Sequence, residues 1–227
     1  MFPPTNATTA TPEATVMTLR CTLLGVGAMN SPRYRPAGLL LSYAGRRVVL
    51  DGGEEATPGR GSLDAWLVTD ERAELVPRLR PLARSYGLTP HAGPYRRGRL
   101  HLTLMAVAHT SHPTYGYLIE AGDRRVVWAP EFWEFPDWAA GADLMFADAA
   151  GWRNPIRFAG GVGGHASVHT TAREAHRLGV RRLVFAHIGR PSIRARDAGQ
   201  QPPYGEWGTD GDHYSLPLTR GAAAPGG

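Results

Sequence analysis

The stretch Leu67-Val68-Thr69-Asp70-Glu71-Arg72-Ala73-Glu74-Leu75 marks the point where the chain changes from strand to helix. Leu67 and Val68 are apolar and are predicted to end a strand, and Thr69 is predicted to form the turn. Residues 73–86 are predicted to form the helix that follows. Asp70, Arg72, Glu74 and Leu75 therefore stand together at one strand-to-helix corner.

The segments on either side of this corner predict a layered α/β domain. Runs of strand-like residues, each of four to nine residues, precede and follow it. These runs cover residues 19–24, 38–43, 47–50, 100–108, 115–120, 125–128, 142–147 and 182–186. Residues 167–178 are predicted to form a second helix, with Ser167 as its N-cap and Gly179 at its end.

A chain of 227 residues with 42% hydrophobic and 20% charged residues has a globular composition. We expect one domain over residues 17–220, a disordered Thr-, Ala- and Pro-rich leader over residues 1–16, and a flexible tail over residues 221–227. Met17 is an alternative start. No signal peptide or membrane span is predicted, and the single Cys21 excludes an internal disulfide, so we expect a cytoplasmic protein.

All 25 basic residues are arginine. The absence of lysine excludes Schiff-base chemistry, a lysine general base and a P-loop lysine. The net charge of +5 permits a nucleic-acid or phosphorylated partner, but no nucleic-acid-binding motif accompanies it.

Further segments carry histidines or carboxylates beside the predicted strands and helices. In chain order they are Asp51-Gly52-Gly53, Ala108-His109-Thr110-Ser111-His112, Ala129-Pro130-Glu131, Gly164-His165-Ala166-Ser167, Ala186-His187-Ile188 and Asp210-Gly211-Asp212-His213-Tyr214. These segments and the corner at Asp70 follow one another in the same order as the motifs of a known family, and such a match is improbable by chance.

This order resembles the metallo-β-lactamase superfamily, in which the corner carries Thr-His-x-His-x-Asp-His. The resemblance spans residues 19–218 and is greatest to the phosphodiesterase branch, which includes tRNase Z and the cyclic phosphoribosyl phosphodiesterases. It implies an α/β fold, a four-layer αββα sandwich. It also implies a hydrolase that acts on a phosphodiester or a small ester through divalent metal ions.

The resemblance also implies a set of metal ligands. Asp70, His109 and Glu131 would hold a first ion, and Glu74, Glu131 and His187 would hold a second. Arg72 and Leu75 stand in the two remaining ligand positions, and neither side chain supplies a ligand atom. A site with one divalent ion (manganese or zinc) and a site with none both stay open.

Two further roles follow for the residues of this site. His165 is a candidate general acid or phosphate contact. Arg72 is a candidate replacement for the metal, because its guanidinium could join Asp70 to Glu131 and supply positive charge. In that alternative the protein is a catalytically inactive member that binds an anionic ligand. A small anionic or phosphate-containing substrate is expected in either case.

The remaining histidines and aromatic residues carry weaker indications. His112, His169 and His176 have no place in the motifs. An aromatic segment next to Glu131 either walls a substrate pocket or anchors its loop on the core, and we favour the anchor. Its members are Trp128, Phe132, Trp133, Phe135 and Trp138.

Overall fold

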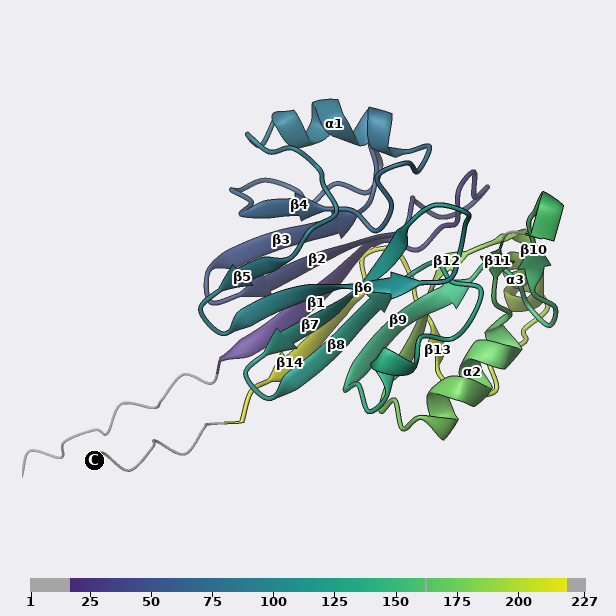
Figure 1. Ribbon diagram of the computed structural model, residues 1–227. Helices are drawn as coiled ribbons and strands as arrows, with labels where there is room; N and C mark the ends of the chain where they lie inside the picture. Colours follow the sequence, from purple (N-terminus) through teal and green to yellow (C-terminus); the bar gives the residue numbers. More distant parts are fainter. Residues whose placement is uncertain (1–16, 162, 220–227) are drawn as a thin grey trace, which may run out of the picture.

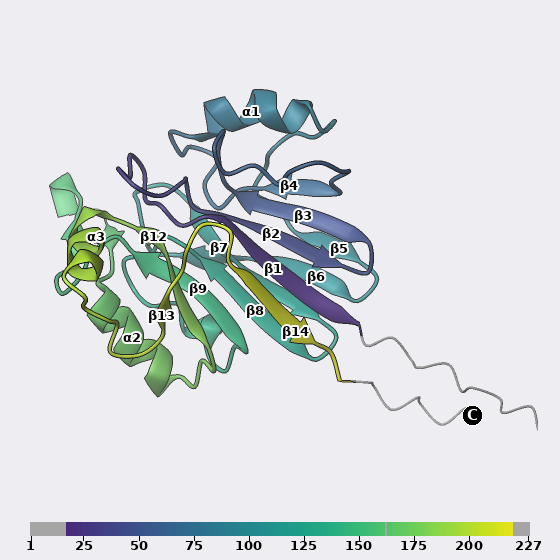
Figure 2. The ribbon, with the colours of Figure 1, turned by 180° about the vertical axis from the view of Figure 1, so that it is seen from behind.

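The structure is a computed structural model that describes residues 17–161 and 163–219. The predicted leader over residues 1–16 and the predicted tail over residues 221–227 lie outside the described residues. The first and last described strands, β1 (Thr18–Gly25) and β14 (His213–Pro217), pair antiparallel, so the two ends of the domain lie side by side (Figures 1 and 2).

Two mixed sheets form the centre of the described part of the chain (Figure 1). The first has five strands in the order β14-β1-β2-β3-β4. The second has seven strands in the order β13-β12-β9-β8-β7-β6-β5. Besides β1 and β14, the strands are β2 (Gly38–Tyr43), β3 (Arg46–Asp51), β4 (Ala65–Leu67), β5 (Tyr95–Arg97), β6 (Leu100–Val107), β7 (Thr114–Ala121), β8 (Arg124–Ala129), β9 (Leu144–Ala149), β12 (Leu183–Ile188) and β13 (Glu206–Trp207). A short hairpin of β10 (Ile156–Arg157) and β11 (Gly164–His165) lies apart from both sheets.

Successive side chains along the strands of the first sheet point alternately into two different hydrophobic cores. In β3, Val48 and Leu50 belong to the large core, and Val49 between them belongs to a second core. In β2, Leu39 and Leu41 face the large core and Leu40 faces the second. Because successive side chains of a strand point to opposite faces, this sheet is apolar on both sides and must be covered on both.

Helices cover the outer faces of the two sheets and complete the αββα sandwich. Helix α1 (Val76–Arg84) buries Val76, Leu79 and Ala83 against the first sheet. Helix α2 (Val168–Arg177) packs on β9 and β12 of the second sheet. Helix α3 (Arg190–Asp197) lies on the same side as α2, opposite α1 (Figures 1 and 2). The short 3-10 turns are η1 (Asp137–Ala139) and η2 (Ala159–Gly161). The predicted four-layer fold is confirmed.

Local structure agrees with the sequence at α2 and differs at α1. Ser167 is the N-cap of α2 and accepts a hydrogen bond from the N–H of Thr170, and Gly179 follows the helix with φ 70°, as predicted. Helix α1 is shorter than the predicted 73–86. The Asp70 carboxylate accepts the N–H of Arg72 in a turn, which delays the start of the helix. The strand predicted to end at Leu67 and Val68 is β4, which ends at Leu67. Helix α3 and the short strands β5 and β13 escaped prediction because they lack a periodic apolar pattern.

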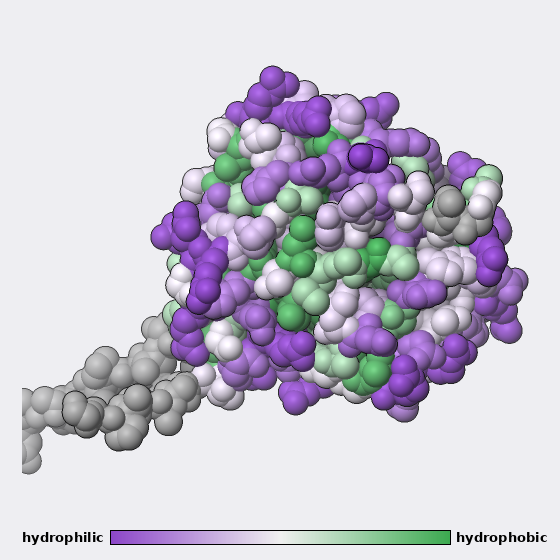
Figure 3. Space-filling view, in the orientation of Figure 1, coloured by the Kyte–Doolittle hydropathy of each residue, from purple (hydrophilic) through white to green (hydrophobic). Residues whose placement is uncertain are grey.

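The aromatic segment next to Glu131 anchors its loop, as favoured from the sequence. Trp128 and Phe132 are fully buried in the large core, and Phe135 and Trp138 pack against it. On the face that Figure 3 shows, hydrophilic residues predominate and apolar residues form small separate groups. No helix in residues 17–161 and 163–219 is long and apolar enough to cross a membrane.

Candidate active site

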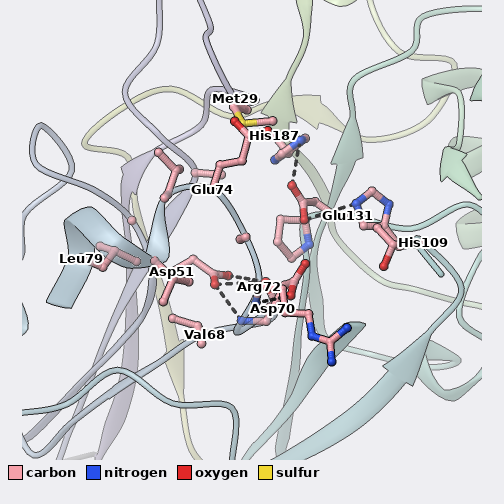
Figure 4. Close-up of a pocket in the computed structure, with 18 of the residues that line it drawn as sticks. Met29, Asp51, Val68, Asp70, Arg72, Glu74, Leu79, His109, Glu131 and His187 are labelled. Atoms are coloured by element: carbon pink, nitrogen blue, oxygen red, sulfur yellow. Dashed lines mark hydrogen bonds and ion pairs between the residues drawn. The ribbon is translucent and has the colours of Figure 1, made fainter. Parts of the chain in front are cut away.

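Most of the histidines and carboxylates singled out from the sequence meet at one edge of the sandwich, around a cavity of about 280 Å³. Asp210 is an exception, because it accepts the N–H groups of Val26 and Arg35 outside the cavity lining. Its walls come from segments that follow strands β1, β3, β4, β6, β8 and β12. Asp70, Glu74, His109, Glu131 and His187 all line it, as do Arg72 and Leu75 (Figure 4). The strand-to-helix corner at Asp70 therefore faces the strand-end histidines, although 34 or more residues separate them in sequence.

Glu131 lies between two of the histidines. Its Oε2 is 3.5 Å from Nε2 of His109, and its Oε1 is 3.2 Å from Nε2 of His187 (Figure 4). His187 has a left-handed backbone (φ 54°) at a register shift between β12 and β9. This conformation is unfavourable for a residue with a side chain and occurs mainly at functional sites. Burial lowers the pKa of His187, and the charge of Glu131 offsets this only in part.

The hydrogen bond of Nδ1 determines which ring nitrogen of His109 carries the proton. Nδ1 of His109 lies 2.8 Å from the carbonyl oxygen of Gly164, and a carbonyl can only accept, so Nδ1 carries the proton. In the neutral ring Nε2 is then a bare acceptor that faces Glu131. The loop can approach His109 this closely because Gly163 and Gly164 have no side chain. A Cβ on Gly163 would lie 2.0 Å from the His109 carbonyl oxygen.

His165 lies behind these two histidines and is held by Asp148. Nδ1 of His165 is 2.7 Å from a carboxylate oxygen of Asp148, which is fully buried. The His165 ring stacks on His187 with centroids 5.2 Å apart and lies 4.7 Å from His109. Of the described residues, those that line the cavity do not include His165, but 12% of its side chain is exposed.

The pKa of His165 lies above its ordinary value. Burial alone would lower it, but the charge of Asp148 and the hydrogen bond to it outweigh burial. The pKa of Asp148 lies below its ordinary value for the matching reason: burial would raise it, and His165 more than compensates. The N–H groups of Phe132 and Ala150 also donate to Asp148. The geometry thus favours a protonated imidazole at His165 over a wider pH range than for a free histidine.

Asp70 is paired with His112, a residue without a place in the motifs. One oxygen of Asp70 lies 2.8 Å from Nε2 of His112, and the other accepts the N–H of Arg72. The predicted bridge from Arg72 to Asp70 and Glu131 does not form, because both carboxylates have other partners. The guanidinium of Arg72 points away from Glu131 (Figure 4), and no acidic side chain of the described residues pairs with it. Glu74 lies at the cavity rim near Met29 and His187 (Figure 4).

Asp51 forms the floor of the cavity. Its carboxylate accepts hydrogen bonds from the N–H and hydroxyl of Thr69 and from Nε1 of Trp128, at 2.7–3.0 Å. Burial raises the pKa of Asp51 to about 7, although these hydrogen bonds act in the opposite direction. Asp51 thereby ties β3 to the turn at Thr69 and fixes where the corner begins.

The side chains present do not fit the two-ion centre that the motif order implies. Such a centre needs three or more donors for each ion. In residues 17–161 and 163–219, no three or more His, Cys, Asp or Glu side chains are arranged as a ready-made ion site. Arg72 and Leu75 supply no donor, and both Asp70 oxygens already have partners. Whether His109, Glu131 and His187 take up a single ion stays a prediction.

The sequence did not lead us to predict Asp148 or His112 as residues of the site. It also did not predict the hydrogen bonds of Asp51 to Thr69 and Trp128. Asp148 carried a usable signal, because it is a carboxylate within the otherwise apolar β9 and a buried charge needs a partner. His112 carried none, since its partner Asp70 lies 42 residues away.

Comparisons with known proteins agree with this geometry. The family described as "Beta-lactamase superfamily domain" matches residues 59–188. No curated protein sequence matches the chain. Among solved structures, the metallo-β-lactamase fold protein YhfI from Bacillus subtilis has a TM-score of 0.70 at 15% identity, over 88% of this chain and 100% of that one. A diphosphatase from the PhnP family has a TM-score of 0.69 at 17% identity, over 90% and 99%.

The short form of human tRNase Z gives a TM-score of 0.64 at 13% identity, over 88% of this chain and 100% of that one. Identities this low show the fold, and the match to the family covers more than half of the chain. Relatives with this fold are mostly hydrolases that bind zinc or other divalent metals. The chain belongs to the beta-lactamase superfamily.

Proposed function

We propose that the protein hydrolyses a small anionic ester, a phosphodiester or a carboxylic ester, by general acid–base catalysis at the cavity. The observation that carries this proposal is the pair of titratable groups, Glu131 and His165, that contact His109 and His187 from different surroundings. Glu131 is a carboxylate exposed to the cavity, and His165 is an imidazole whose pKa is raised beside Asp148. Pairs of titratable groups with contrasting environments are typical of acid–base sites.

Glu131 is assigned to the base side of the reaction. Its Oε2 and the bare Nε2 of His109 are two neighbouring acceptors, and both can accept the O–H groups of one water molecule. The water oxygen forms the new bond to the phosphorus or carbonyl carbon, and its proton passes to Glu131. His187, kept neutral by burial, holds the other oxygen of Glu131 in place.

His165 is assigned to the acid side. Asp148 binds its Nδ1, and among the described residues nothing bonds to its Nε2, so that proton is available for the leaving oxygen. When the ester bond breaks, the leaving group takes the proton from His165 and departs as an alcohol. One proton enters at Glu131 and one leaves at His165, so a proton must return from Glu131 to His165 before the next turnover.

Arg72 is assigned to substrate binding. Arg72 is among the residues that line the cavity, its side chain is exposed, and it has no acidic partner in the part of the chain that the structure describes. A permanent cation without a partner favours a substrate with a negative charge, since guanidinium binds phosphate and carboxylate with paired hydrogen bonds. The volume of about 280 Å³ restricts the bound part to a small group.

Hydrolysis assays test the proposal directly. Bis(4-nitrophenyl) phosphate and mono-4-nitrophenyl succinate, which are both anionic, are offered to the wild type, Glu131→Gln and His165→Gln. His176→Gln on the exposed side of α2 is the matched control. For the cleaved substrate we expect kcat to fall about 10²- to 10⁴-fold in the two site variants, which is the usual share of a general acid or base. The control variant should keep its rate. Equal rates in the wild type and Glu131→Gln would refute the proposal.

A second candidate function is binding of an anion without catalysis, which the unpaired Arg72 also favours. It predicts no hydrolysis of either substrate, together with binding of inorganic phosphate that Arg72→Gln abolishes. Calorimetry with phosphate on the same protein samples separates the two candidates.

A further inference from the structure

The cavity has an apolar side that the proposed chemistry does not use. Six residues form this apolar wall, namely Met29, Ala37, Val68, Leu75, Val76 and Leu79. Leu79 and Val68 lie on the opposite side of the cavity from His109 (Figure 4). The reacting groups at Glu131 and the apolar wall at α1 therefore face each other across one small space.

The apolar wall offers a ligand no hydrogen bonds from the start of α1. The N–H groups of Val76, Arg78 and Leu79 bond to the carbonyls of Ala73 and Leu75. Pro77 has no N–H, and Leu75 stands at the N-cap without a side-chain hydrogen bond. The helix terminus is thus not available to an anion, and what the wall can bind is an apolar group.

The exposed side chain of Met29 shows that a ligand can reach the apolar wall. Val68, Val76 and Leu79 are at most 3% exposed and belong to the second core, but Met29 at the rim is 46% exposed. Among the described residues, the large hydrophobic side chains exposed to this degree are Met17 and Met29. An unbranched thioether at a cavity rim can adapt to apolar groups of different shapes.

We propose that the apolar wall binds an alkyl group of the substrate, which makes the substrate an amphipathic small ester. This inference rests on the proposed function for its reactive end. The negative charge of the substrate lies toward Arg72, the ester bond lies at Glu131, and the alkyl group lies on Leu75, Leu79 and Val68. Leu75 lies in the strand-to-helix corner and places an apolar side chain on this side of the cavity. It therefore contributes to the preference for a substrate with an alkyl group.

Calorimetry with alkylphosphonates tests the inference without any reaction, because their carbon–phosphorus bond is not hydrolysed. Methyl-, ethyl-, propyl- and butylphosphonate are titrated into the wild type, Leu75→Asn and Leu82→Asn. Leu82 is a matched control: it lies in α1 and is half-buried like Leu75, but it is not among the described residues that line the cavity. Asn suits a helix N-terminus, so the Leu75 variant should fold.

We expect Kd to fall about fourfold for each added methylene in the wild type and in Leu82→Asn. In Leu75→Asn the gain should drop below about twofold per methylene. Equal Kd values from methyl to butyl in the wild type, or no binding of any phosphonate, would overturn the inference. Chain-length dependence without hydrolysis of any ester would support the apolar site and refute only the proposed function.

Discussion

The indole of Trp128 provides a direct test of how the cavity floor is held. Its Nε1 donates to the Asp51 carboxylate at 2.7 Å, and Trp66 donates to the backbone carbonyl of the same residue at 2.8 Å. Both indoles are fully buried. Trp128→Phe and Trp66→Phe therefore remove similar volumes and one hydrogen bond each, but only Trp128→Phe removes a donor from the carboxylate.

The magnitude follows from the charge on the acceptor. A hydrogen bond to a charged group contributes about 1.5–3 kcal/mol, and 1.36 kcal/mol corresponds to one pKa unit. Trp128→Phe should thus raise the pKa of Asp51 from about 7 by roughly one to two pH units. Trp66→Phe should leave the pKa within about half a unit of the wild type, because the acceptor it loses carries no charge.

Carboxyl ¹³C titration by NMR measures the pKa, and urea unfolding at several pH values measures its consequence. A carboxyl whose pKa is raised by folding stabilises the protein fully below its unfolded pKa and loses that contribution as pH rises. Between pH 3.8 and about 7, the Asp51 contribution should therefore fall by up to about 4 kcal/mol. A wild-type Asp51 midpoint near 4, or equal shifts in the two tryptophan variants, would refute this account of Asp51.

Three further predictions concern the acid, the metal and the loop at His109. Asp148→Asn should lower the pKa of His165, so the alkaline limb of the kcat/KM profile should move to lower pH; an unmoved limb would show that His165 is not the acid. Elemental analysis after expression with manganese and zinc should give less than about 0.1 ion per wild-type chain and substantially more for the Arg72→His, Leu75→His double variant. Stoichiometric metal in the wild type would contradict the metal-free reaction. Gly164→Ala places a Cβ 1.9 Å from the Ile156 carbonyl oxygen and should lower the free energy of unfolding, measured in urea, by about 3 kcal/mol. The control Gly179→Ala has open space around its Cβ and should lower the free energy of unfolding by only about 1–2 kcal/mol.

Many of the strands and helices could be predicted from local signals, whereas the four-layer arrangement could be predicted only through the resemblance to the superfamily. The short apolar run Leu39-Leu40-Leu41 after Gly38 predicts a buried strand. Ser167 caps α2 by accepting the N–H of Thr170, three residues further along the chain. His109 and His187 could be placed at the site only through the resemblance to the superfamily, because their strands β6 and β12 are not neighbours in the sheet.

The partners within the site could not be predicted, because they depend on loop conformation. Asp70 was expected to face Arg72 or a metal, but a carboxylate two residues before an N–H closes a turn with it readily. That turn directs the remaining oxygen of Asp70 to His112, which arrives on a separate loop. No periodic pattern in the sequence indicates such a contact. The sequence therefore predicted which residues lie at the site but not which of them contact each other.

These pairings set the surroundings of the four carboxylates that line one small cavity. Asp51 has a pKa near 7 and is partly protonated at neutral pH. Asp70 contacts His112, and Glu131 contacts both His109 and His187. Glu74 is exposed to water at the rim. Each carboxylate therefore has a proton, an imidazole or solvent beside it, and Arg72 is the one arginine among the described residues that line the cavity. A guanidinium binds phosphate and carboxylate groups with paired hydrogen bonds, and for this reason we place the negative charge of the substrate at Arg72.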